Sequence, residues 1–234
     1  MDEKARAPAA AKRPARWHRE QPWPIRITHW CNAVFLAIMA GSGLQIFTAY
    51  PNLGPRGALY SWYPFQGVPP PGWLRLGGWL QGGRQLHFAF AWFFTLTGLC
   101  YVIYLIVSGQ WRRRLFLPRR DLRNAIAQFA YYVRLRPAAP ENDFYNGLQR
   151  LAYTSALLFG IVMVISGLAL YQPVQLHYLT WLCGGYDSAR AIHLAGLTLL
   201  AMFVATHVIL VALHPRELVK MITGGKRGTD FNQA

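Results

Sequence analysis

The segment at residues 188–215, SARAIHLAGLTLLAMFVATHVILVALHP, constrains the fold most strongly. It is apolar over the length of a membrane span and carries His193 and His207 within that span, with His214 at its end. On an α-helix, residues fourteen apart are separated by about 21 Å along the axis and point to nearly the same side. A polar ring inside hydrocarbon is costly and normally faces the bundle interior with a partner. The segment therefore predicts one helix that offers a ligand near each membrane face.

Three more apolar segments of similar length precede this one, so we expect an all-α membrane protein built as a four-helix bundle. Hydrophobic residues make up 53% of the 234 residues and charged residues only 14%. This composition is too apolar for a typical soluble domain. The expected spans are approximately residues 26–50, 84–107, 144–171 and 188–213.

The basic residues predict the orientation of these spans. Seven Lys and Arg residues fall in the first 26 residues, eight between residues 112 and 136 and four after Pro215. The connections at residues 51–83 and 172–187, together with the first turns of the spans that follow them, hold four. By the positive-inside rule, both termini and the middle connection are expected in the cytoplasm. We expect a basic cytoplasmic arm over residues 1–25, a membrane domain over 26–215 and a cytoplasmic tail over 216–234.

The formal net charge of +15 does not indicate a nucleic-acid surface, because the positive residues are gathered in blocks between apolar segments. We expect membrane lipid as a partner and no nucleic acid. Within the middle connection, DLRNAIAQFAYYVRLR at residues 121–136 predicts a short amphipathic helix on the inner surface.

In this topology, four histidines fall into two pairs at matching membrane depths. His29 and His207 lie near the cytoplasmic face, and His87 and His193 lie near the outer face. The spacing of His193 and His207 does not require His29 and His87 to lie at the same two depths. We therefore predict two metal centres, one at each level.

Haem is the metal group that these pairs fit best. Two imidazoles do not complete a structural zinc site, and no intramembrane carboxylate or thiol is placed to add ligands. Two imidazoles on opposite sides of the ring are what a six-coordinate haem requires. Because the chain has no CxxCH motif, two haems b are expected, held by ligation and packing.

Arginines near the helix ends are candidates for pairing with the haem propionates: Arg26, Arg84 and Arg190. An arginine that extends toward lipid headgroups is the alternative for each of them. The connection at residues 51–83 is rich in Pro, Gly and aromatic residues. It predicts either a docking surface for a partner protein or an anchor at the headgroup level.

Five stretches carry a family resemblance, and together they cover nearly the whole chain: RITHWCNAVFLAIMAGSGLQIF, LGGWLQGGRQLHF, YNGLQRLAYTSALLFGIVMVISGLALYQPVQL, GGYDSARAIHLAGLTLLAMFVATHV and MITG. In them the sequence resembles the prokaryotic cytochrome b561 and nickel–iron hydrogenase b-type cytochrome superfamily, most closely the thiosulfate-reductase-type cytochrome b subunits. The resemblance implies the same haem ligands: His29, His87, His193 and His207. It also implies an inner-membrane subunit that transfers electrons between the quinone pool and a periplasmic redox partner, typically a molybdopterin oxidoreductase.

Two other functions stay open at this stage. One is a stand-alone oxidoreductase, similar to superoxide-oxidising cytochrome b561, that passes electrons from superoxide to quinone. The other is a membrane anchor with no redox role, in which the matched histidines are accidental. The direction of electron flow, the position of the quinone site and the formation of a homodimer are left open by the sequence.

Overall fold

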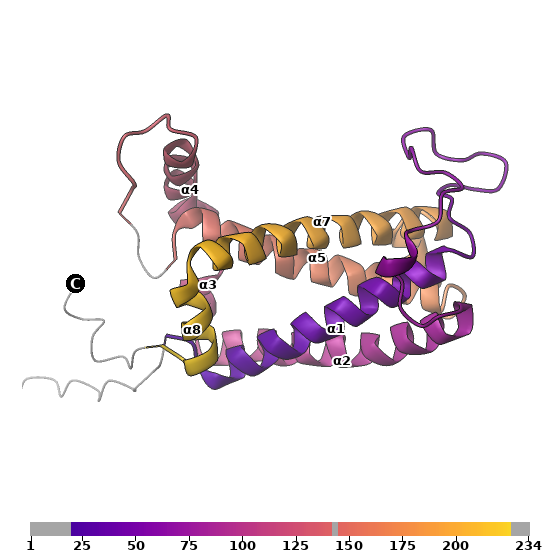
Figure 1. Ribbon diagram of the computed structural model, residues 1–234, viewed down its shortest axis with the longest axis horizontal. Coiled ribbons are helices and arrows are strands. Elements are labelled where there is room, and N and C mark those ends of the chain that lie inside the picture. The colour runs from indigo at the N-terminus through magenta and orange to yellow at the C-terminus, as the bar shows by residue number, and fades with distance from the viewer. Residues whose placement is uncertain (1–19, 142–144, 226–234) are drawn as a thin grey trace, which may run out of the picture.

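The computed structural model describes residues 20–141 and 145–225 of the chain. Within these ranges all regular structure is helical, and four long helices run antiparallel to form an elongated bundle (Figure 1). Residues 1–19 of the predicted basic arm, the predicted span start at residue 144 and the tail beyond residue 225 lie outside the described residues. The long helices are α1 (Trp23–Phe47), α2 (Leu80–Val107), α5 (Gly147–Tyr171) and α7 (Tyr186–Leu213).

Each long helix has the length and composition of a membrane span. Large apolar side chains point outward along them, including Leu99 and Ile103 on α2 and Met202 and Ile209 on α7. Such a surface would be unfavourable in water but suits a lipid environment. Helix α1 begins three residues before the predicted span, because prolines at 22 and 24 suit the first turn of a helix.

Short helices cap both ends of the bundle. One end, which we call the loop end, holds the connection at residues 51–79, with a 3₁₀ turn at Gly72–Leu74, and α6 (His177–Leu182). The opposite end, the arginine end, holds three short helices: α3 (Trp111–Arg114), α4 (Pro118–Tyr132) and α8 (Pro215–Thr223). Helix α8 runs across the arginine end from α7 to the start of α1 (Figure 1).

The bundle consists of two tightly packed helix pairs, α1 with α2 and α5 with α7. Glycines permit the close approach within each pair. A Cβ atom on Gly83 of α2 would lie 2.9 Å from the Gln45 side chain on α1, and one on Gly196 of α7 would lie 2.7 Å from Met163 Sδ on α5. Contacts between the two pairs are sparse.

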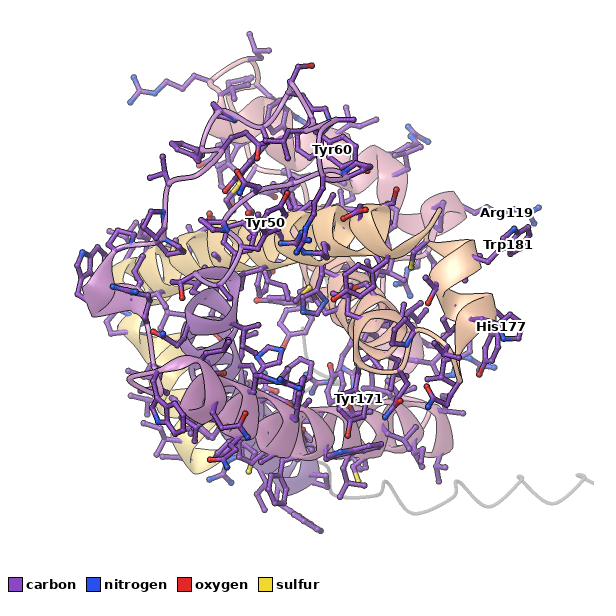
Figure 2. All side chains as sticks on the ribbon, turned by 90° about the vertical axis from the view of Figure 1, so that its right-hand side faces the viewer. Tyr50, Tyr60, Arg119, Tyr171, His177 and Trp181 are labelled. Carbon is purple, nitrogen blue, oxygen red and sulfur yellow. The ribbon has the colours of Figure 1, made fainter. Side chains whose placement is uncertain are left out.

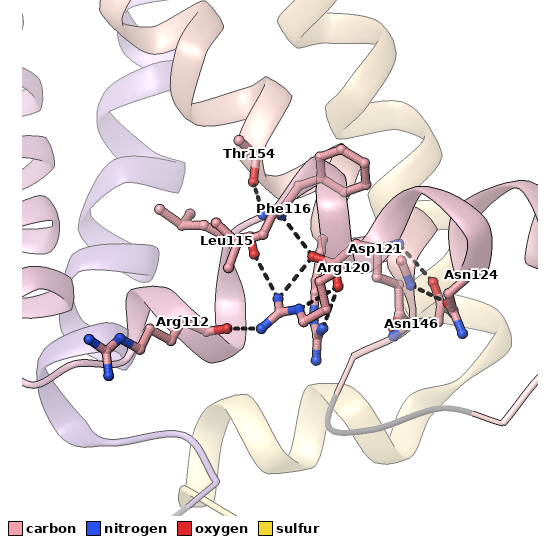
Figure 3. A network of polar contacts seen from close by, with 12 residues as sticks. Arg112, Leu115, Phe116, Arg120, Asp121, Asn124, Asn146 and Thr154 are labelled. Carbon is pink, nitrogen blue, oxygen red and sulfur yellow. Dashed lines mark hydrogen bonds and ion pairs between the residues drawn. The ribbon is translucent and has the colours of Figure 1, made fainter.

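A buried carboxylate docks α4 onto α5 at the arginine end (Figure 3). Asp121 Oδ1 lies 2.6 Å from Arg120 Nε and 2.8 Å from an Arg150 guanidinium nitrogen, and Asp121 Oδ2 accepts a 2.8 Å hydrogen bond from the Leu117 N–H. The side chains of Asp121 and Arg150 are almost fully buried. Asn124 Oδ1 also accepts a hydrogen bond from the Gly147 N–H at the start of α5.

We expect the docking of α4 to depend on ionised Asp121. Burial raises the pKa of this carboxyl, but hydrogen bonds from Arg120, the Leu117 N–H and Arg150 outweigh burial and hold the pKa at about 2. Because the folded pKa lies below the ordinary value of 3.8, the stabilisation is complete above about pH 4 and is lost as the pH falls toward 2. Asp121→Ala leaves Arg150 without this buried partner, a change that typically costs about 3–5 kcal/mol.

Hydrogen exchange of the α4 amides, corrected for the intrinsic pH dependence of exchange, measures this effect. Wild-type protection should stay constant from pH 7 to 5 and fall below pH 4. Asp121→Ala should lower protection between pH 7 and 5, and its difference from the wild type should shrink as the pH falls toward 2. Glu217→Gln is the matched control, because its ion pair with Lys220 is exposed and contributes little. Unchanged α4 protection in Asp121→Ala would contradict the role of Asp121 in docking α4.

Candidate functional sites

The four predicted histidines form two close pairs, one toward each end of the bundle. The ring centroids of His29 on α1 and His207 on α7 are 6.1 Å apart. Those of His87 on α2 and His193 on α7 are 6.2 Å apart. Each histidine lies about two turns from an end of its helix. Helix α7 thus contributes one ring to each pair, and the other ring comes from the opposite helix pair.

These separations fit a metal ion between two imidazoles. With metal–nitrogen bonds of about 2 Å on opposite sides of the ion, the ring centroids lie roughly 6 Å apart. No group of three or more His, Cys, Asp or Glu side chains converges anywhere in residues 20–141 or 145–225. The donor set is therefore two imidazoles, which fits a haem iron, whose other four ligands come from the ring, and does not fit zinc.

The two imidazoles near the loop end are fixed by hydrogen bonds to the helix packed beside each of them. His87 Nδ1 lies 3.0 Å from the Met39 carbonyl oxygen and 3.3 Å from Ser42 Oγ. His193 Nδ1 lies 2.9 Å from Ser166 Oγ. Both serines are fully buried. Since Nδ1 is engaged in both rings, Nε2 is the nitrogen left to bind a metal.

Two glycines follow these serines and lie against the same rings. A Cβ atom on Gly43 would lie 3.1 Å from His87 Cε1, and one on Gly167 would lie 3.3 Å from His193 Cε1. Such distances are shorter than ordinary carbon–carbon contacts of about 3.5–4.0 Å. The absence of a side chain at these positions allows the rings to occupy their observed places.

The pair near the arginine end has aromatic surroundings. The ring of His207 stacks on Phe203 at a centroid distance of 5.7 Å, and Tyr153 lies edge-on at 6.4 Å. His29 has Trp30 edge-on at 5.1 Å. His29 Nδ1 is buried and has no hydrogen-bond partner in the part of the chain that the structure describes.

The structure places the three predicted arginines in different surroundings. Arg26 donates to the carbonyls of Met221 and Ile222 at the end of α8. Arg190 donates to the Tyr50 carbonyl at 2.8 Å. Arg84 is exposed, and its guanidinium carbon lies 5.8 Å from the centre of the Phe88 ring.

Arg75 was not predicted as a site residue. Its Nε is buried and has no hydrogen-bond partner among the described residues. The segment around it packs on α1, where a Cβ atom on Gly41 would lie 3.0 Å from Leu76 Cβ. A signal for this arginine was its position as the one charged residue within the apolar stretch WLRLGGWL.

The loop end is tied to the start of α7. Tyr60 and Tyr50 lie on the α7 side in Figure 2, and the Tyr60 hydroxyl is 3.4 Å from Ser188 Oγ. His177 and Trp181 on α6 point outward, away from the bundle (Figure 2). His177 therefore does not join either histidine pair.

Comparison with known proteins agrees with this architecture. Residues 20–224 match the family described as prokaryotic cytochrome b561. The chain is 39% identical over 204 residues to a protein of Azospira oryzae provisionally named protein-methionine-sulfoxide reductase subunit YedZ1, covering 87% of this chain and 94% of the relative. It is 23% identical over 200 residues to an Escherichia coli K12 protein provisionally named Ni/Fe-hydrogenase 1 B-type cytochrome subunit, covering 79% and 78%.

Four apolar helices with histidines facing one another between them define a membrane cytochrome of the b type. The chain belongs to the prokaryotic cytochrome b561 family, so the family predicted from the sequence is confirmed. It is a multi-pass protein of the bacterial inner membrane, and its family implies haem b as a cofactor. Both of these relatives are named as subunits of redox enzymes.

Proposed function

We propose that the chain binds two haems b and transfers electrons between the quinone pool and a redox protein at the periplasmic face. His29 and His207 would hold the iron of the cytoplasmic-side haem, and His87 and His193 that of the periplasmic-side haem. The observation that carries this proposal is the presence of two imidazole pairs, one toward each end of a membrane-spanning bundle. Their ring centroids are 6.1 and 6.2 Å apart. Haem supplies reversible one-electron chemistry when bound.

The charge distribution supports this orientation. The arginine end carries the basic residues of α3, α4 and the connection that follows them. The positive-inside rule places this end in the cytoplasm and the loop end in the periplasm. The pair His87 and His193 would then lie on the side of a periplasmic partner.

The protein's own residues would position the haems and control their surroundings. Imidazole orientation would be set at the loop end by Ser42, Ser166 and the Met39 carbonyl. Arg26, Arg84 and Arg190 stay candidates for propionate pairing, because a guanidinium has five N–H donors and the contacts described above use only some of them.

We infer that the periplasmic partner is a molybdopterin oxidoreductase that docks at the loop end. The family resemblance supports the partner class, and the Azospira oryzae relative is itself named as a reductase subunit. Exposed aromatic side chains gather on this end, among them Trp62, Phe65 and Trp181. The connection that carries the first two is ordered by Gln66, whose side chain hydrogen-bonds both the N–H and the carbonyl of Leu53.

Anaerobic mixing of the haem-loaded protein with a short-chain quinol tests the quinone part of the proposal. We expect the quinol to increase the absorbance of reduced haem and the matching quinone to decrease it again. Absence of exchange in either direction would contradict quinone chemistry. A parallel mixture with superoxide and quinone distinguishes the rival function, because quinone reduction faster than in the same mixture without the protein, and with no partner protein present, would identify a stand-alone oxidoreductase.

A further inference from the structure

We infer that the matched segments at residues 39–43 (MAGSG) and 163–167 (MVISG) lower the reduction potential of the loop-end haem below that of the arginine-end haem, with Ser42 and Ser166 as positioning residues. The inference rests on the proposed binding of two haems. Both segments have the pattern M-x-x-S-G, one on α1 and one on α5. The segment on α1 lies against His87 of α2, and the segment on α5 lies against His193 of α7.

Each serine is oriented by a hydrogen bond to its own helix. Ser42 Oγ donates to the Ile38 carbonyl at 2.7 Å, and Ser166 Oγ donates to the Val162 carbonyl at 2.7 Å. Because a hydroxyl has one proton, the oxygen lone pairs are left to accept from the imidazoles. The ring nitrogens that face them, His87 Nδ1 at 3.3 Å and His193 Nδ1 at 2.9 Å, are therefore donors.

The two loop-end imidazoles thus share the tautomer with the proton on Nδ1. The Met39 carbonyl, 3.0 Å from His87 Nδ1, can only accept and requires the same tautomer. Gly43 and Gly167 leave each ring room to approach its serine. Both segments therefore hold a ring with Nε2 unprotonated and available to iron.

The arginine-end pair lacks this arrangement. His29 Nδ1 has no hydrogen-bond partner in the described ranges, and the His207 ring packs against the aromatic rings of Phe203 and Tyr153. A hydrogen bond accepted from Nδ1–H makes the imidazole a stronger electron donor to its metal. Stronger donation favours ferric over ferrous iron, so the loop-end haem should have the lower potential. The arginine-end haem should accept the first electron.

Potentiometry of the full chain in single-haem backgrounds tests this inference. His29→Ala retains the loop-end haem, and His87→Ala retains the arginine-end haem. We expect the retained loop-end haem to have the lower midpoint potential. In the His29→Ala background, Ser42→Ala and Ser166→Ala should each raise that midpoint, the double variant should raise it further, and Ser166→Thr, which keeps the hydroxyl, should stay close to the parent.

Ser108→Ala is the matched control, because Ser108 makes the same bond to the carbonyl four residues earlier, at 2.6 Å, and none to an imidazole. The reverse order of midpoints, or serine variants that retain haem without a shift, would overturn the inference and leave the two-haem proposal intact. If Ser42→Ala and Ser166→Ala lose haem, the order of the midpoint potentials in the two single-haem backgrounds still tests the inference. Wild-type protein with fewer than two haems would instead contradict the proposed function.

Discussion

Replacement of His193 by alanine is expected to remove the loop-end haem and reduce haem content from two to about one per chain. Without this imidazole the iron loses one of its two protein ligands, and b-type haem is held only by ligation and packing. His207→Ala, on the same helix, should remove the arginine-end haem and leave the other. Pyridine haemochrome analysis of monodisperse protein measures the stoichiometry directly.

His214→Ala is the control for this pair of variants. His214 also lies at the end of α7 but is exposed, and its Nδ1 makes a 3.0 Å hydrogen bond with the Leu210 carbonyl oxygen. It should retain both haems. Retention of two haems by both His193→Ala and His207→Ala would refute the ligand assignment. Because each variant keeps one complete pair, loss of all haem from both would show that the two sites are not independent.

Leucine at Gly43 or Gly167 is expected to have the second-largest effect, the loss of the loop-end haem alone. The first side-chain atom would already lie 3.1 Å from His87 or 3.3 Å from His193, and three further carbons would enter the same space. Overpacking of this kind forces neighbouring groups to move. The rings cannot then keep the separation of 6.2 Å that fits a metal between them.

Gly160→Leu provides the comparison on α5. A Cβ atom there meets only Phe94 Cζ, at 4.0 Å, so this variant should keep both haems with an unchanged spectrum. Haem content and the visible spectrum of the three leucine variants, purified in parallel, test the prediction. Equal haem retention by all three would show that the glycines do not limit the space at the loop-end pair.

The level of each histidine along the bundle could be predicted from the sequence because it depends only on helix rise and helix ends. His193 and His207 lie fourteen residues apart on one continuous helix, so their levels follow from the spacing. The close approach of His29 to His207 also needed two different helices to face each other. That approach depends on interhelical packing, which a periodicity pattern does not specify.

Other features depended on tertiary contacts that sequence spacing does not encode. An amphipathic helix was predicted over residues 121–136, whereas α4 spans Pro118–Tyr132, and the burial of Asp121 against Arg150 was not predicted. Arg26 stands at the start of the first span, yet its guanidinium donates to carbonyls of α8, nearly two hundred residues later in the chain. The repeat M-x-x-S-G was visible in the sequence and would have pointed to Ser166.

The central claim, two bis-histidine haems b per chain, is tested most directly by the visible spectrum of the purified wild-type protein, oxidised and dithionite-reduced, with pyridine haemochrome quantification. We predict two haems b per chain, both low-spin and both reducible. A folded preparation from haem-replete cells that contains no haem, or a single haem at saturation, would contradict the account.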